Sequence, residues 1–133
     1  MSEEDAGKCD AMVNLEVLGV GGPFLWTNGS TDALEAVAHE VAKEEKLKLE
    51  DHVIEGVGAD NLSYEKLGIP NITIDGLPVD RMELIHSAAD RYENIDGETY
   101  CVTYRLVLAY LRKLDRLPPR QEPAGKKSGD REK

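Results

Sequence analysis

Aromatic residues and long apolar runs are scarce in this sequence. It contains one Phe and one Trp in 133 residues, so its core must be mostly aliphatic. No apolar stretch approaches the ~20 residues that a membrane-spanning helix requires. The acidic residues 1–10 also lack the apolar segment of a secretion signal. We therefore expect a cytoplasmic protein with no membrane span.

Basic residues are outnumbered by acidic ones. There are 16 Lys and Arg against 26 Asp and Glu, which gives a formal net charge of -10. Nucleic acids and anionic membranes both attract proteins through Lys and Arg. The charge balance therefore argues against nucleic-acid and membrane partners, and it is compatible with cationic substrates or metal ions.

Cysteine is rare as well, with only Cys9 and Cys101 present. Their separation matches no metal-binding or redox motif. We interpret both as free thiols of a cytosolic chain rather than as a disulfide.

The order of apolar segments predicts an α/β fold. We expect a flexible acidic segment over residues 1–10, one domain over residues 11–117 and a disordered tail over residues 118–133. The expected elements are strands at 11–20, 52–57 and 71–77, helices at 30–47, 61–67 and 97–117, and either a short strand or an extended loop at 24–27. This alternation predicts a three-layer arrangement, with a largely parallel or mixed sheet flanked by helices.

Several common catalytic motifs are missing or incomplete. The glycine-rich segment 19–23 follows a strand, but no helix or phosphate-binding Lys comes directly after it, so we interpret it as a turn. His39 and Glu40 begin a zinc-binding HExxH pattern, but Lys43 occupies the position of the second His. We therefore interpret His39 as a surface residue. No GxSxG motif is present, which argues against a serine hydrolase of that type.

Two residues stand out from their surroundings. Glu16 lies inside an apolar strand, where a buried carboxylate is costly unless it is paired or bound to a metal. His86 follows an apolar pair in an otherwise polar loop. The pattern alone leaves two interpretations open for each residue: a solvated position, or a functional one at the carboxyl end of a strand.

Three motifs in order resemble one family of enzymes. NLEVLG at 14–19 is similar to the N-L-D-M-x-G strand of the di-zinc aminopeptidases. ADN at 59–61 and GIP at 68–70 resemble the S-D-H and G-I-P segments of that family. HSAAD at 86–90 and NID at 94–96 resemble its H-T-x-x-D and N-I-D segments, which precede a final long helix. The chain thus resembles the C-terminal half of a zinc-dependent exopeptidase catalytic domain.

The resemblance implies specific roles for four residues. Five side chains hold two zinc ions in that family, and the resemblance places Glu16 at the fourth ligand position and His86 at the fifth, on different ions. Glu16 replaces the Asp of the family and carries its carboxylate on a longer arm. Asp60 and Asp90 would support the metal ligands or face the substrate.

The other ligands of the family would lie upstream of this sequence. Residues 1–10 contain no histidine, and Glu3-Glu4 is only superficially similar to the Glu pair that contains the catalytic glutamate. Catalytic zinc sites typically use three protein ligands, and a carboxylate must also move the proton. One ligand for each ion would hold neither ion firmly.

We therefore expect part of a zinc-dependent aminopeptidase that acts on peptides but is inactive alone. The chain would be either a fragment of such an enzyme or a subunit whose missing half a partner chain or a second copy supplies. Two alternatives remain open: a non-catalytic domain that keeps this core for binding or assembly, and an unrelated α/β protein whose resemblance is accidental.

Overall fold

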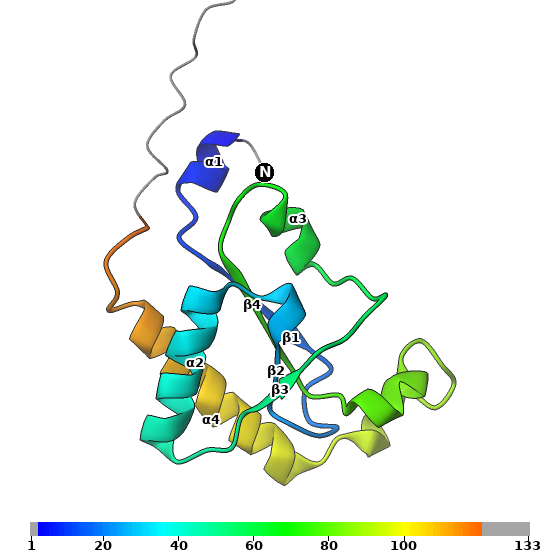
Figure 1. The fold of residues 1–133 in the computed structure, drawn as a ribbon. Helices are drawn as coiled ribbons and strands as arrows, with labels where there is room; N and C mark the ends of the chain where they lie inside the picture. The colour runs from blue at the N-terminus through cyan, green and yellow to red at the C-terminus, as the bar shows by residue number, and fades with distance from the viewer. Residues whose placement is uncertain (1–2, 121–133) are drawn as a thin grey trace, which may run out of the picture.

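A mixed four-stranded sheet forms the centre of the protein. The computed structural model describes residues 3–120, so most of the predicted tail lies outside the described residues. The strands β1 (Met12–Glu16), β2 (Phe24–Trp26), β3 (Glu50–His52) and β4 (Asn71–Asp75) are arranged in the order β1-β4-β2-β3. β1 runs parallel to β4 and β2 parallel to β3, whereas β2 and β4 are antiparallel. The predicted α/β fold with a mixed sheet flanked by helices is confirmed (Figure 1).

The core lies between the sheet and two long helices. α2 (Asp32–Glu45) and α4 (Gly97–Leu114) pack against each other and against one face of the sheet (Figure 1). The Tyr110 hydroxyl donates a hydrogen bond to the Leu34 carbonyl oxygen at 3.3 Å, which joins the two helices inside the core. The central core side chains are fully buried: Leu25, Ile72, Ile74, Leu106 and Tyr110.

The opposite face of the sheet is polar toward the ends of its strands. Side chains alternate along a strand, so residues paired in register share a face. Asn14 and Glu16 of β1 are paired with Thr73 and Asp75 of β4 and face away from the core. The short helix α3 (Asn61–Glu65) and the loops after the strands cover this face. A polar sheet face under loops is a suitable place for a functional site.

The third strand begins and ends earlier than the predicted 52–57, and a side chain explains why. Asn28 donates to the Ile54 carbonyl oxygen at 2.9 Å and accepts from the Ile54 amide at 3.0 Å. The Asn28 side chain thus takes the place of a partner strand after His52. The pairing with β2 ends there, and Val53 and Val57 are exposed.

The acidic segment at the start also differs from the expected flexible lead-in. Residues Glu3–Gly7 form the short helix α1, and Ala6 is buried. Lys8 makes an exposed ion pair with Glu4 at 2.7 Å, one helical turn away. The segment at 24–27 adopts the strand alternative as β2. Both cysteines are free, as predicted.

No helix in the described part of the chain is both long enough and apolar enough to cross a membrane.

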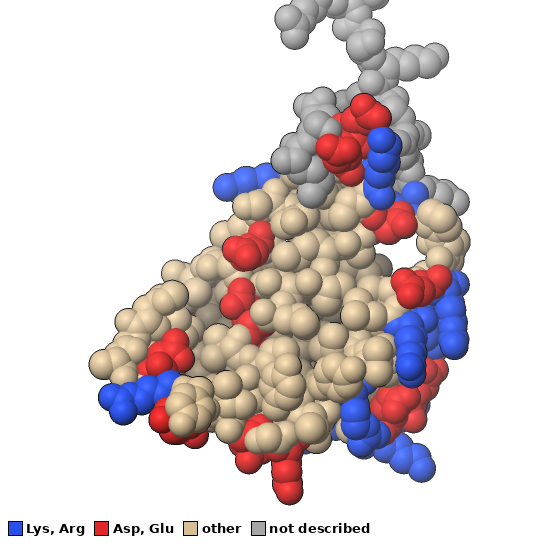
Figure 2. All heavy atoms as spheres, turned by 180° about the vertical axis from the view of Figure 1, so that it is seen from behind, with Lys and Arg blue, Asp and Glu red and all other residues tan. Residues whose placement is uncertain are grey.

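On the face seen in Figure 2, most side chains are uncharged and the basic ones lie toward the margins.

β1 lies at the edge of the sheet, and apolar side chains are exposed on it and on α4. Its outer side has no partner strand among residues 3–120. Leu15 on β1 is 44% exposed, and Tyr100 and Tyr104 on α4 are 45% and 57% exposed. An open strand edge with exposed apolar side chains is a template for association with another chain.

We expect the chain to self-associate through the β1 edge. The substitution Leu15→Lys should shift the protein toward the monomer, because charged side chains on edge strands oppose strand pairing between chains. Val53→Lys is the matched control, because it adds the same charge at an exposed position after the opposite edge strand. Sedimentation velocity measures both variants. A monomeric wild-type protein at high concentration, or equal effects of the two substitutions, would count against this interface.

Candidate active-site pocket

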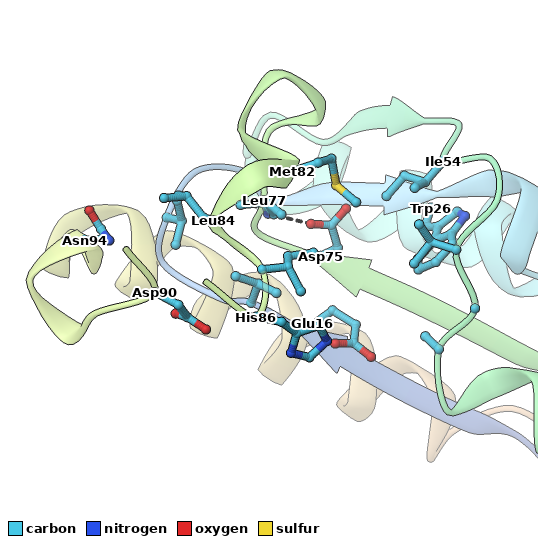
Figure 3. A pocket seen from close by; sticks show the side chains of 16 residues that line it. Glu16, Trp26, Ile54, Asp75, Leu77, Met82, Leu84, His86, Asp90 and Asn94 are labelled. Carbon is cyan, nitrogen blue, oxygen red and sulfur yellow. Dashed lines mark hydrogen bonds between the residues drawn. The ribbon is translucent and has the colours of Figure 1, made fainter. Parts of the chain in front are cut away.

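A pocket of about 230 Å³ lies beside the carboxyl ends of β1 and β4 (Figure 3). Residues from β1, β2 and β4 and from the segments that follow β1, β3 and β4 line it: Glu16, Val17, Val20, Trp26, Ile54, Val57, Gly58, Ala59, Asp75, Leu77, Met82, Leu84, Ile85, His86, Asp90 and Asn94. Most of these side chains are apolar, three are acidic, and none is Lys or Arg. The pocket thus combines an apolar wall with concentrated negative charge.

Strand register places two carboxylates side by side in this pocket. Glu16 and Asp75 are direct partners on parallel strands, so both side chains leave the sheet on the same face. Gly76 allows the following loops to meet, because a Cβ at this position would lie 2.6 Å from the Val17 carbonyl oxygen. The Gly76 amide also donates to the Glu16 carbonyl oxygen at 3.0 Å. The two strand ends are therefore held together by backbone contacts.

Glu16 is partly buried and has a defined partner. The Asn14 side-chain amide donates to the Glu16 Oε1 atom at 3.0 Å, and Asn14 itself is buried. This arrangement orients the carboxylate while leaving capacity for another partner. Glu16 therefore lines a pocket rather than lying on a fully solvated edge.

His86 reaches the same pocket from the loop after β4. The 3-10 helix η2 (Val79–Leu84) carries the chain over the pocket, and His86 has a left-handed backbone with φ of 58°. The Ser87 hydroxyl donates to the Leu84 carbonyl oxygen at 2.9 Å, and Asn94 donates to the Ala89 carbonyl oxygen at 2.7 Å. These bonds fold the loop back on itself, with the His86 side chain near Glu16 (Figure 3).

The structure brings together three of the four residues singled out from the sequence. Glu16, His86 and Asp90 all line the pocket. Asp60 is exposed at the start of α3 and does not line it, although its neighbours Gly58 and Ala59 do. The metal-binding and supporting roles of all four residues stay predictions. His39, interpreted as a surface residue, is exposed and lies 3.0 Å from Asp51.

Asp75 is a pocket residue that the sequence reasoning missed. It is 2% exposed, and its Oδ1 atom accepts a short hydrogen bond from the Leu77 amide. Burial raises the pKa of Asp75 to about 6, opposed by the Leu77 hydrogen bond and by His52, while Glu16 adds a smaller upward contribution. The available signal was an acidic residue at the end of an apolar strand, the same signal that identified Glu16.

The second oxygen of Asp75 has no hydrogen-bond partner among the described residues. His52 Nδ1 lies 3.8 Å from this oxygen and also lacks a hydrogen-bond partner among the described residues. The His52 ring stacks on Phe24 with 3.8 Å between ring centroids and 19° between planes. This stacking fixes the imidazole beside Asp75 at a distance too long for a hydrogen bond.

The donors at the pocket do not form a complete zinc site. Among residues 3–120, no group of three or more His, Cys, Asp or Glu side chains is arranged to hold a metal ion. A catalytic zinc ion typically has three protein ligands. Glu16 and His86 offer one carboxylate and one imidazole, so the described donor set fits part of such a centre and not the whole.

Comparison with known proteins gives one match. The family model described as peptidase family M28 matches residues 1–111. No curated protein and no solved structure matches the chain.

Asp75→Asn should remove a pH dependence of stability. The native carboxyl group has a pKa of about 6 against an ordinary value of 3.8, so the native state holds this proton more tightly than the unfolded state. The contribution of Asp75 to the free energy of unfolding is therefore fully present below pH 3.8 and is lost as the pH rises toward 6. By linkage the free energy of unfolding falls by about 1–3 kcal/mol over this range.

Denaturant unfolding of wild type, Asp75→Asn and Asp80→Asn at pH 4 and pH 7 measures this difference. Asp80 is exposed and does not line the pocket, so it controls for the loss of one charge. The free energy of unfolding of Asp75→Asn relative to wild type should rise between the two pH values. An equal change in Asp80→Asn would contradict the assignment.

Proposed function

This chain belongs to peptidase family M28, and we propose that it forms part of a zinc-dependent exopeptidase that removes residues from the N-termini of peptides. Glu16 and His86 would serve as metal ligands, and Asp90 would support them from the mouth of the pocket. The single observation that carries this proposal is that one pocket brings together a β1 carboxylate and an imidazole from the loop after β4. These are the residue types and positions that the sequence resemblance implies.

The same proposal makes the chain inactive by itself. One carboxylate and one imidazole do not hold a catalytic zinc ion firmly, and hydrolysis also needs a carboxylate that moves a proton. The remaining ligands would come from outside the described donor set, either from the rest of an enzyme of which this chain is a fragment or from a partner chain or second copy. The open edge of β1 offers a place for such a partner.

A second candidate function is a non-catalytic binding or assembly domain. The observation that favours it is the lack of any three-donor cluster within residues 3–120. In that case the pocket would bind a peptide without cleaving it. For both candidates we propose a cytoplasmic location, which the free state of Cys9 and Cys101 supports.

Purified alone with zinc or cobalt, the chain should not hydrolyse aminoacyl anilides, because no ion is held firmly enough to activate water. A chromogenic assay over a series of N-terminal residues measures this. Robust hydrolysis that disappears in His86→Ala would show that the chain is a complete enzyme, and would overturn the proposed incompleteness.

Zinc binding by the isolated chain should be weak and should depend on the pocket. Glu16→Ala and His86→Ala should each weaken it further, because each removes one of the two proposed ligands. His39→Ala is the matched control, because His39 is exposed, pairs with Asp51 and does not line the pocket. Isothermal titration calorimetry measures all four proteins. Tight binding of two ions, or equal losses in the His39 and His86 variants, would contradict the ligand assignment.

A further inference from the structure

We propose that the pocket selects a basic residue of the peptide, with the side-chain ammonium or guanidinium group held at Asp75 and its aliphatic stem against the apolar wall. This rests on the proposed role in peptide processing and adds the class of residue that the pocket accepts. It assigns to Asp75 a role in specificity that is separate from metal binding.

The buried end of the pocket carries an unused hydrogen-bond acceptor. Asp75 is 2% exposed, and only its Oδ1 atom has a hydrogen-bond donor, the Leu77 amide. No donor within residues 3–120 reaches the second oxygen, and His52 Nδ1 lies 3.8 Å away, too far for a hydrogen bond. Leaving a buried carboxylate oxygen unpaired is costly. An ammonium group, with three donors and a positive charge, supplies what this oxygen lacks.

The wall of the pocket suits an aliphatic stem. Trp26, Ile54, Leu77 and Met82 line it, and Figure 3 shows the Asp75 carboxylate among these side chains. The volume of about 230 Å³ is smaller than the roughly 300–1,000 Å³ of pockets for drug-sized ligands. It therefore suits one side chain rather than a longer stretch of peptide. Lys and Arg combine an apolar stem with a charged tip, which matches a pocket with an apolar wall and a carboxylate at its buried end.

The remaining charges in the pocket favour the same ligand. Glu16 and Asp90 line it together with Asp75, and no Lys or Arg does. Carboxylates grouped against low-dielectric walls attract cations and repel acidic side chains. A purely apolar residue would fit the wall, but it would leave the buried second oxygen of Asp75 without a donor. The pocket therefore discriminates against both acidic and purely apolar residues.

The experiment uses the chain without added metal, so it measures binding independently of hydrolysis. Trp26 is the only tryptophan and lines the pocket, so its fluorescence reports occupancy there. Three ligands distinguish binding through a side-chain ammonium group from binding through an α-amino group. N-acetyl-lysine methylamide carries only the side-chain ammonium, norleucine methylamide carries only the α-amino group, and N-acetyl-norleucine methylamide carries neither.

N-acetyl-lysine methylamide should bind at least about tenfold more tightly than either norleucine ligand, as expected for a charged hydrogen bond in a buried site. Asp75→Asn should abolish this preference while keeping an acceptor for the Leu77 amide. Asp80→Asn, which removes an exposed charge outside the pocket, should retain the preference. Circular dichroism checks that each variant is folded.

Equal binding of the three ligands, tighter binding of norleucine methylamide, or a preference that survives in Asp75→Asn would overturn the proposal. If Asp75→Asn does not fold, acetylation of the lysine ε-amino group serves instead, and it should reduce wild-type binding to the level of N-acetyl-norleucine methylamide. The proposed exopeptidase role fails separately, through the hydrolysis and zinc-binding measurements.

Discussion

The parallel register between β1 and β4 is the constraint on which the pocket depends. It pairs Glu16 with Asp75, so two carboxylates leave the sheet at the same level and on the same face. Gly76 then allows the two following loops to touch, and its amide bonds to the Glu16 carbonyl oxygen. A shift of one residue in either strand would turn one of these carboxylates toward the aliphatic core. The acidic character of the pocket and the packing of the core are thus fixed by the same pairing.

The chain belongs to a peptidase family, yet its described residues do not supply a full set of metal ligands. The two findings are compatible if the active enzyme includes protein beyond the described residues. The described residues supply a pocket, an apolar wall and two candidate ligands, but no three-donor cluster. The pocket itself is complete within the described residues. Binding of a peptide side chain to it can therefore be measured without metal and without hydrolysis.

Sequence reasoning predicted the fold and part of the pocket for identifiable reasons. Helical periodicity predicted the two long helices, and in the structure Asp96 caps the second of them by accepting from the Thr99 amide at 2.8 Å. Glu16 stood out as a carboxylate in an apolar strand and His86 as a histidine after an apolar pair, and the order of three motifs resembling one family then implied a role for each. Asp75 was missed because its burial and its unpaired oxygen depend on which loops cover the strand end. The end of β3 was misplaced because the distant Asn28 side chain bonds to Ile54 where a partner strand would continue. Contacts between residues far apart in the chain were the part that periodicity could not reveal.

The antiparallel pairing of β2 with β4 joins the two parallel strand pairs and determines what surrounds Asp75. Because Phe24 is paired with Asp75 and Trp26 with His52, the face that carries the carboxylates continues into these three side chains of β2 and β3. One half of this face is acidic and the other half is aromatic, and they come from strands of opposite direction. Trp26 lines the pocket directly, whereas Phe24 and His52 act on it through Asp75, beside which the stacked imidazole lies. A substitution at Phe24 or His52 would therefore change the affinity of Asp75 for a proton even though neither side chain lines the pocket.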